Sequence, residues 1–386
     1  MGTGPTIFLS AAEASGDHHA AGLVRALKDR LPGARFVGAA GPAMQEAGCE
    51  SIIDLTASAT MLGGVLGKIM YYRRAVRKIR ESIREIRPDI LVPVDSPALN
   101  WHVAKAAKAG SIPVMYYVAP QVWAWAPWRI KKVRRLTDHV ACLLPFEEEY
   151  FRSRDVAATF VGHPLFDRLP ESRESRECPD LAGAWHEGSW RVAMLPGSRA
   201  GEIAGIAPAM AVTAAEICKR WAKAECTFLA ADELAADRIR AATRREDLHI
   251  VTGDPDRVLS DSHFAVAASG TVTLQVASYG IPMAIVYNIS AWQKLFWKLF
   301  VRRLIRTKHL SLVNILAGRE IVPELMPYFR NTGEVVSTAI ECMEDYGWLY
   351  STRDKLLELT EPLRSRGLET AAGRTADLIV DMLGGA

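Results

Sequence analysis

Residues 191–205, which read RVAMLPGSRAGEIAG, constrain the fold of this chain more than any other stretch. The first five residues are a short apolar run typical of a buried parallel strand, and a turn through Gly197 and Ser198 follows before a helical pattern opens at Glu202. Such a turn frees backbone N–H groups, and the helix N-terminus adds partial positive charge. Arg199 can add two parallel hydrogen bonds to phosphate oxygens. The segment therefore predicts a phosphate site, although a Gly-Ser turn after a strand can also be only a turn.

A second stretch has the same design. The apolar run 264–268 leads directly into Ser269, Gly270 and Thr271, and a helical pattern follows. Because ligands of parallel α/β sheets bind at the carboxyl ends of the strands, the two turns indicate one ligand with two phosphates. The alternative is that Ser269 to Thr271 is only a helix N-cap, which would use the same donors.

Strands and helices alternate along both halves of the chain. Apolar runs that predict strands lie at 6–9, 36–39, 89–94, 113–118, 139–144 and 158–161, and then at 191–195, 226–230, 248–251, 264–268 and 283–287. This predicts an α/β protein of two doubly wound domains facing across a cleft. We expect an N-terminal domain over 1–168, a linker over 169–190, a nucleotide-binding domain over 191–345, and C-terminal helices over 346–386. Whether these last helices pack back on the N-terminal domain is left open.

The charge and cysteine content exclude some functions. The net charge of +3 is small beside 47 basic and 44 acidic residues, so the overall balance does not indicate a nucleic-acid partner. The six cysteines are scattered, without CxxC pairs or His/Cys clusters of metal-ligand spacing, which predicts a reducing cytosolic compartment and no metal. The N-terminus lacks the basic residues and the length of a signal peptide.

Acidic residues follow two of the predicted strands. Glu13, Ser15, Gly16 and Asp17 crowd the turn after the first strand, where paired acids can perform acid/base chemistry or bind a sugar. Asp95 stands at the tip of the strand over 89–94, where catalytic bases commonly lie. Either aspartate can instead be a helix N-cap.

Two stretches combine apolar and basic residues. Residues 57–88 begin apolar and become a basic amphipathic helix, and residues 290–309 carry six basic residues and no acid among aromatic ones. Both suit a helix that contacts acyl chains or an anionic membrane surface, and the alternative is ordinary core packing. The side chains expected at the membrane or acyl chains are Met61, Leu62, Val65, Leu66, Trp292, Phe296, Trp297 and Phe300. Tryptophans and basic residues also mix over 123–135, where a half-buried helix is preferred to nucleic-acid binding.

Nine strings, in this order and over nearly the whole chain, resemble one family. They are AEASGD, GPAM, VDSPALN, YYVAPQVWAW, LLPFE, FVGHPL, LPGSR, ASGT and SLVNILAGREIVPEL. The chain thereby resembles the bacterial lipid-A-disaccharide synthases, which are GT-B glycosyltransferases. The resemblance implies an inverting transfer, without metal or cofactor, from UDP-2,3-diacylglucosamine to 2,3-diacylglucosamine 1-phosphate with release of UDP.

The resemblance also implies roles for single residues. Asp95 matches an essential acid and Arg199 an essential arginine that meets the diphosphate. Gly197, Ser198, Ser269, Gly270, Thr271, Gln275, Asn314, Arg319 and Glu320 are the further residues expected to bind substrate. The chain departs from the family pattern at Ala12, at Ala98, and at Gln275, where the family has a glutamate for the ribose hydroxyls.

The resemblance implies an enzyme attached peripherally to the cytoplasmic side of the inner membrane, and it leaves a homodimer open. Two other functions remain as alternatives. One is a different GT-B enzyme acting on UDP-GlcNAc-type sugars. The other is a non-catalytic peripheral membrane protein that binds a nucleotide sugar.

Overall fold

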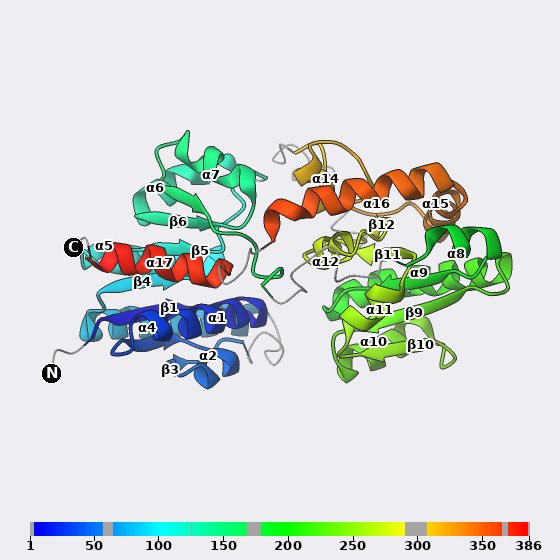
Figure 1. Cartoon of the computed structure of the whole chain (residues 1–386). Helices are drawn as coiled ribbons and strands as arrows, with labels where there is room; N and C mark the ends of the chain where they lie inside the picture. The colour runs from blue at the N-terminus through cyan, green and yellow to red at the C-terminus, as the bar shows by residue number, and fades with distance from the viewer. Residues whose placement is uncertain are drawn as a thin grey trace. The chain divides into compact units, whose positions relative to one another are not determined.

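The computed structural model describes residues 4–56, 65–124, 126–167, 179–289, 307–364 and 370–384. The chain forms two compact units, one made of Met1–Glu171 with Leu363–Ala386 and the other of Ser172–Pro362. Both units are layered α/β structures with parallel sheets (Figure 1). The predicted fold class is confirmed: the protein is an α/β protein of the GT-B class, and each unit is doubly wound around a parallel sheet.

The first unit has the strand order β3-β2-β1-β4, and the order continues through β5-β6-β7. Parallel bridges between Leu91 and Val114 and between Val94 and Tyr117 connect the two parts. The strands are β1 (Thr6–Ser10), β2 (Arg35–Ala39), β3 (Glu50–Ile53), β4 (Ile90–Pro93), β5 (Met115–Tyr117), β6 (His139–Cys142) and β7 (Ala158–Phe160). The order reverses its direction between β1 and β4, and loops that leave the sheet at such a switch point diverge to form a crevice.

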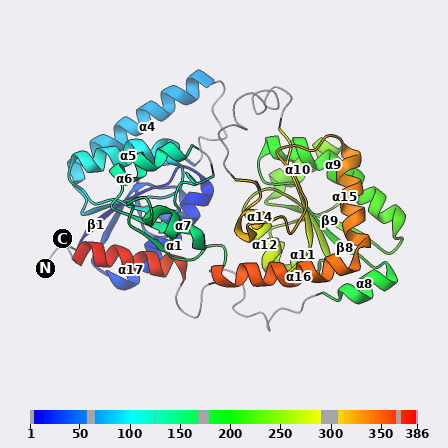
Figure 2. The same cartoon turned by 90° about the horizontal axis from the view of Figure 1, so that it is seen from above.

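Side chains of this sheet alternate between two cores, as the period of two in a strand requires. Ile7 and Leu9 pack into one core with α1 and α17, whereas Phe8 packs into the other with α4 and α5. Figure 2 shows these two helical layers on opposite sides of the strands. The helices are α1 (Ala14–Arg30), α2 (Pro42–Glu46), α4 (Val65–Ile86), α5 (Pro97–Ala109), α6 (Ile130–Leu136), α7 (Pro145–Arg152) and α17 (Ala371–Gly384).

The second unit repeats this plan with the order β10-β9-β8-β11-β12-β13, so its switch point lies between β8 and β11. Its strands are β8 (Arg191–Leu195), β9 (Glu225–Ala230), β10 (His249–Thr252), β11 (Phe264–Ala268), β12 (Met283–Val286) and β13 (Glu324–Leu325). Its helices are α8 (Leu181–Glu187), α9 (Ala200–Arg220), α10 (Glu233–Thr243), α11 (Pro255–Asp261), α12 (Val272–Ser278), α14 (Leu312–Ala317), α15 (Thr332–Glu344) and α16 (Tyr346–Thr360). The two-residue β13 was not predicted, because so short a strand has no detectable pattern.

The segment expected to be a linker contains a helix. Asp180 caps the N-terminus of α8 by accepting a hydrogen bond from the Gly183 N–H at 3.0 Å, and Gly188 ends this helix at a positive φ of 67°. Leu181 and Ala184 bury against the core of the second unit. Seven residues make barely two turns, so the periodicity that would reveal this helix in the sequence is too short to recognise.

The C-terminal helices also divide differently from the expected boundary at residue 346. Helix α16 belongs to the second unit, and only the chain from Leu363 joins the first. There α17 lies along α1, where Arg30 and Asp377 form an ion pair, and Asp167 accepts a hydrogen bond from the Ala371 N–H at 2.9 Å.

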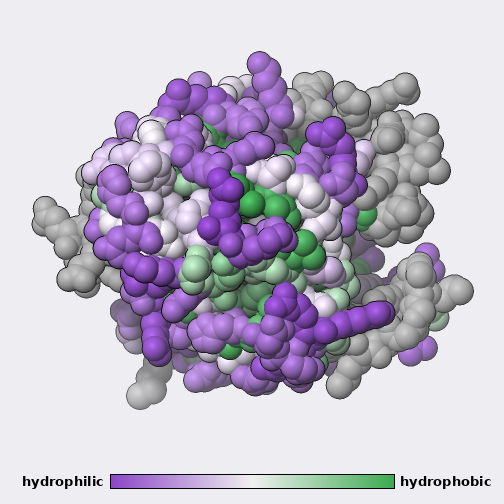
Figure 3. All heavy atoms as spheres, turned by 90° about the vertical axis from the view of Figure 1, so that its right-hand side faces the viewer, coloured by the Kyte–Doolittle hydropathy of each residue, from purple (hydrophilic) through white to green (hydrophobic). Residues whose placement is uncertain are grey.

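One helix of the described residues, α9, is long and apolar enough to span a membrane by composition. Half of its most apolar window is buried, and side chains such as Ile203, Ile206 and Met210 pack into the core of the second unit. Core helices meet the same criterion, so α9 is accounted for by packing. Figure 3 shows mainly hydrophilic residues on the side of the molecule that it presents, with apolar ones confined to a small area.

Candidate active site

Two loops meet at the switch point of the first unit. The first follows β1 and starts helix α1, and the second carries Asp95 after β4. Gly16 is buried between them, and a Cβ placed on it would lie 3.5 Å from the Val94 carbonyl oxygen and 3.9 Å from the Asp95 Cβ. Glu13 and Ser15 are exposed at the start of α1. The structure therefore brings together Gly16 and Asp95, as their positions after neighbouring parallel strands predict.

Asp95 sits in an unusual turn. Asp95 and Ser96 are consecutive non-glycine residues with positive φ, at 50° and 42°, directly before Pro97 opens α5. The left-handed conformation costs about 1–2 kcal/mol for each such residue, and strain of this kind gathers at functional sites. Asp95 itself is half-buried. The capping alternative for Asp95 is not what the structure has, since the N-cap residue of α5 is Ser96, without a side-chain capping bond.

Buried polar groups hold this turn. The Asn100 Nδ2 donates to the carbonyl oxygens of Asp95 at 2.7 Å and Val94 at 3.1 Å, and the Tyr116 hydroxyl donates to the Asp95 carbonyl at 2.8 Å. The Asn100 Oδ1 accepts from the Ser10 hydroxyl at 2.8 Å, which ties the ends of β1 and β4 together. Burial and the neighbouring Asp95 raise the pKa of Tyr116 well above its usual value, so its hydroxyl stays a donor.

Asp17 has a structural role. Its carboxylate is buried and accepts hydrogen bonds from the backbone N–H groups of Gly41 at 2.9 Å, Ala43 at 2.9 Å and Met44 at 3.2 Å. It therefore caps the neighbouring helix α2 rather than its own helix, which is the alternative that the sequence raised. Both carboxylate oxygens of Asp17 are thus engaged by the backbone of this buried region, which favours a structural role.

The loop after β5 carries the tryptophan string. Trp123 is buried and its indole N–H donates to Glu147 Oε1 at 2.8 Å, while the N–H groups of Leu143 and Leu144 donate to Oε2 at 3.0 Å each. Burial raises the pKa of Glu147 to about 7, against the lowering effect of these three donors. Trp128 is exposed, and Trp125 lies outside the described residues.

The turn after β8 is the first of the two turns that the sequence predicts to bind phosphate. Gly197 has a φ of 96°, which favours glycine, and Ser198 and Arg199 are exposed. The Arg199 Nη1 lies 3.1 Å from Glu202 Oε1, on the first turn of α9, and the arginine side chain is 73% exposed. The guanidinium is thus held in place at the carboxyl end of β8 and accessible to a ligand.

The turn after β11 lies on the other side of the same switch point. Gly270 has a φ of 148°, and a Cβ placed on it would have no atom within 4 Å, so the space beside it is open. Thr271 is exposed, and the Thr273 hydroxyl donates to the Gly270 carbonyl at 2.7 Å. The two glycine turns therefore flank the switch point, where a sheet of this order binds ligands.

Gln275 has a partner that sequence reasoning missed. Its Nε2 donates to Asp256 Oδ1 at 3.0 Å, and the same oxygen accepts from the Tyr279 hydroxyl at 2.8 Å. Asp256 and Gln275 are both half-buried. Gln275 replaces the glutamate expected from the resemblance, but a carboxylate still lies beside this position, because Asp256 of α11 is hydrogen-bonded to Gln275. No spacing in the sequence links Asp256 to α12.

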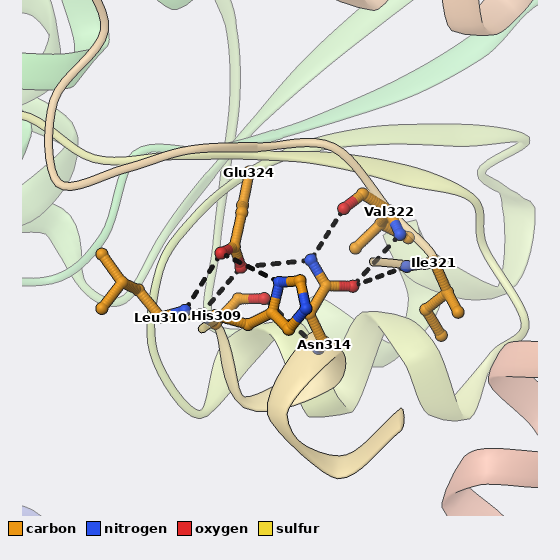
Figure 4. A network of polar contacts seen from close by, with 7 residues as sticks. His309, Leu310, Asn314, Ile321, Val322 and Glu324 are labelled. Atoms are coloured by element: carbon orange, nitrogen blue, oxygen red, sulfur yellow. Dashed lines mark hydrogen bonds and ion pairs between the residues drawn. The ribbon is translucent and has the colours of Figure 1, made fainter. Parts of the chain in front are cut away.

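Asn314, expected to bind substrate, uses its whole amide inside the protein (Figure 4). Its Nδ2 donates to the Val322 carbonyl at 2.8 Å and to Glu324 Oε2 at 3.1 Å, and its Oδ1 accepts from the N–H groups of Ile321 at 2.9 Å and Val322 at 3.2 Å. An amide has two donors and two acceptor sites, so none remains for a ligand. The residue shapes the loop on which Arg319 and Glu320 are exposed.

Most residues expected at the membrane or acyl chains lie outside the described part of the chain. These are Met61, Leu62, Trp292, Phe296, Trp297 and Phe300. Val65 and Leu66 begin α4, whose side chains are described from Met70 onward. There Met70 is 50% and Tyr72 38% exposed, and Arg73, Arg74 and Arg77 are exposed beside them.

Comparisons of the sequence with a family model and with curated proteins point to one family, and solved structures share the fold. The family described as lipid-A-disaccharide synthetase matches residues 7–357. The lipid-A-disaccharide synthase of Geobacter sulfurreducens is 34% identical over 386 residues, covering 99% of this chain and 98% of that protein. The fold is similar to that of the S. aureus MnaA-UDP co-structure, with a TM-score of 0.60 at 11% identity over 97% of this chain and 94% of that one. It is also similar to Acinetobacter baumannii MurG, with a TM-score of 0.56 at 13% identity over 98% and 99%.

Proposed function

This chain belongs to the lipid-A-disaccharide synthase family, and from that premise we propose which of its residues carry the transfer. It is a hexosyltransferase of lipid A biosynthesis that uses a UDP-sugar donor and a sugar-phosphate acceptor. We propose that the donor is UDP-2,3-diacylglucosamine, that the acceptor is 2,3-diacylglucosamine 1-phosphate, and that lipid A disaccharide 1-phosphate and UDP are the products.

In the proposed reaction Asp95 is the general base. An acceptor hydroxyl oxygen forms a bond to the anomeric carbon of the donor, the bond from that carbon to UDP breaks, and the hydroxyl proton passes to the Asp95 carboxylate. The observation that carries this assignment is the turn of Asp95 and Ser96, at φ 50° and 42°, at the switch point beside Gly16. Asp17 is less suited to the role because three backbone N–H groups occupy its carboxylate.

The departing UDP is proposed to meet the second unit. As the bond breaks, negative charge gathers on the diphosphate, and preorganised donors are most effective where charge develops. Arg199, aligned by Glu202 at 3.1 Å, supplies a guanidinium that can bind two phosphate oxygens. The turns at Gly197 and Gly270 supply backbone N–H groups at the carboxyl ends of β8 and β11. In this scheme Glu13 and Ser15 line the acceptor side, and Gln275 with Asp256 lines the donor side.

We further propose peripheral attachment to the cytoplasmic face of the inner membrane. The support is the start of α4, where exposed Met70 and Tyr72 stand beside Arg73, Arg74 and Arg77. Apolar side chains beside arginines suit a surface of anionic headgroups. A homodimer stays a prediction.

Release of UDP from the donor, with and without acceptor, tests the assignment of Asp95. Asp95→Asn keeps the size of the side chain but cannot accept a proton, so we expect kcat to fall by about 10²- to 10⁴-fold with UDP affinity unchanged. Asp29→Asn, at an exposed acid of α1 in the same unit, is the matched control and should keep the full rate. Retention of the rate by Asp95→Asn, together with its loss in Glu13→Gln, would move the base to the loop after β1.

A further inference from the structure

The turn that carries Asp95 adopts a backbone conformation that its residues disfavour. Neither Asp95 nor Ser96 is a glycine, and both have positive φ. Such a pair persists only where surrounding groups over-determine it. The nearest such groups are two buried side chains, Asn100 and Tyr116, which arrive from different elements, α5 and β5.

Both side chains bind the same atom, the carbonyl oxygen of Asp95. The Asn100 Nδ2 donates at 2.7 Å and the Tyr116 hydroxyl at 2.8 Å, so both lone pairs of that oxygen are occupied. The Asp95 N–H donates to the Tyr117 carbonyl at 3.1 Å. The peptide groups on both sides of the Asp95 Cα are therefore fixed, and so is the direction of its Cα–Cβ bond.

We propose that Asn100 and Tyr116 are positioning residues that hold the left-handed turn of Asp95 and Ser96 and so aim the Asp95 carboxylate. This rests on the proposed function, in which Asp95 is the base. Neither side chain touches substrate in this scheme. If these two donors are lost, the turn relaxes toward the conformations that Asp and Ser prefer, and the carboxylate moves away from the acceptor hydroxyl.

Neighbouring residues of β5 offer a matched pair of variants. Tyr116→Phe removes one hydroxyl and its hydrogen bond to Asp95 while the ring keeps its packing against Trp101, at 5.9 Å between ring centroids. Tyr117→Phe removes the adjacent hydroxyl, which is equally buried but has no hydrogen-bond partner among the described residues. The two variants lose the same atom from the same strand, and only the first loses a bond to the turn.

We expect Tyr116→Phe to lower kcat by about 10- to 100-fold, since a small misplacement of a reacting group has effects of this size. The KM for the donor should match that of Tyr117→Phe, which should keep its kcat. The melting temperature of Tyr116→Phe should be the lower of the two, because only this variant loses a hydrogen bond. A kcat of Tyr116→Phe within about 3-fold of the Tyr117→Phe value would overturn the proposal, because misplacement by 1 Å alone costs more.

A second substitution that restores activity would show that Tyr116 acts by positioning the turn and not by contacting the substrate. Glycine adopts positive φ without a steric cost, so Ser96→Gly in the Tyr116→Phe background should restore the turn in part and raise kcat by about 2- to 5-fold. No recovery, or a further loss, would contradict a role through the turn.

Asp95→Asn, measured in parallel, distinguishes the two possible failures. If Asp95→Asn keeps its rate, the assignment of the base is wrong. If Asp95→Asn loses its rate and Tyr116→Phe does not, the base stands and the positioning role is wrong.

Discussion

The guanidinium of Arg199, the N-cap residue of α9, and the carboxylate of Glu202, in the first turn of that helix, lie 3.1 Å apart, with the arginine 73% exposed and the glutamate 15% exposed. The Glu202 side chain is thus mostly buried, whereas the Arg199 guanidinium is open to solvent. An exposed ion pair of this kind adds little to stability. Its value is to orient the guanidinium at the carboxyl end of β8.

Arg199→Ala should therefore abolish turnover while leaving the fold intact. Because the guanidinium is needed most as charge gathers on the leaving UDP, the loss should appear in kcat as well as in KM, by about 10²-fold or more. Steady-state kinetics with circular dichroism of the variant provide the measurement. Arg244→Ala, in the same unit, is a control that should be active. A rate within a few-fold of the unmodified protein would remove Arg199 from the site.

Asn314→Ala should act first on stability. The substitution leaves the N–H groups of Ile321 and Val322 without their acceptor, and the Val322 carbonyl without its donor. Each buried polar group left unpaired costs about 1–3 kcal/mol, so the midpoint of urea unfolding should fall clearly. Equal unfolding midpoints with a raised KM would instead support direct binding by Asn314.

His163 should make the stability of the first unit sensitive to acid. Burial lowers its pKa to about 3, and its Nδ1 accepts a hydrogen bond from the Leu165 N–H at 3.2 Å, which requires the neutral ring. The unfolded chain takes up a proton near pH 6.5 and the folded one does not. The stabilisation is therefore present above about pH 6.5 and is lost as the pH falls from there toward 3, with a slope of about 1.4 kcal/mol per pH unit.

Urea unfolding at pH 7 and pH 5 measures this slope. His163→Asn keeps an acceptor for the Leu165 N–H but does not titrate, so its free energy of unfolding should change less between the two pH values. The exposed His18→Gln serves as the control and should behave like the unmodified protein. If the free energy of unfolding of His163→Asn changes with pH as steeply as that of the unmodified protein, His163 is not the source of the acid sensitivity.

The proposed membrane attachment can be tested with substitutions in the basic, aromatic stretch 290–309, most of which lies outside the described residues. Replacing Trp297 and Phe300 together with Ser should release the protein from anionic vesicles, and high salt should release the unmodified protein in part, because salt screens the basic residues over 290–309. Sedimentation with vesicles of anionic and of neutral lipid is the measurement. Met70→Ser with Tyr72→Ser would report the separate contribution of α4. Unchanged sedimentation throughout would indicate that these segments have a structural role.

Local patterns in the sequence were sufficient to predict the two doubly wound domains and the loops that carry the proposed site. A buried parallel strand followed by a glycine turn and a helix is recognisable over about fifteen residues, as at 191–205, and the carboxyl ends of parallel strands must share one edge. Glu13, Asp95, Arg199 and Gly270 could thus be assigned to the sheet edges from the sequence.

Only the tertiary structure decided which of the predicted site residues have polar atoms that are available for chemistry. The sequence pattern predicted Asp17 and Asn314 as site residues. In the structure the Asp17 carboxylate accepts hydrogen bonds from the backbone of α2, and the Asn314 amide is bonded to the backbone of the loop that follows α14. Asp256 is a partner of Gln275 because the fold brings its side chain, at the start of α11, within 3.0 Å of an α12 side chain. Tyr116 binds the Asp95 carbonyl from another strand. Hydrogen bonds between elements depend on how the elements pack, and a sequence pattern records only how each element forms.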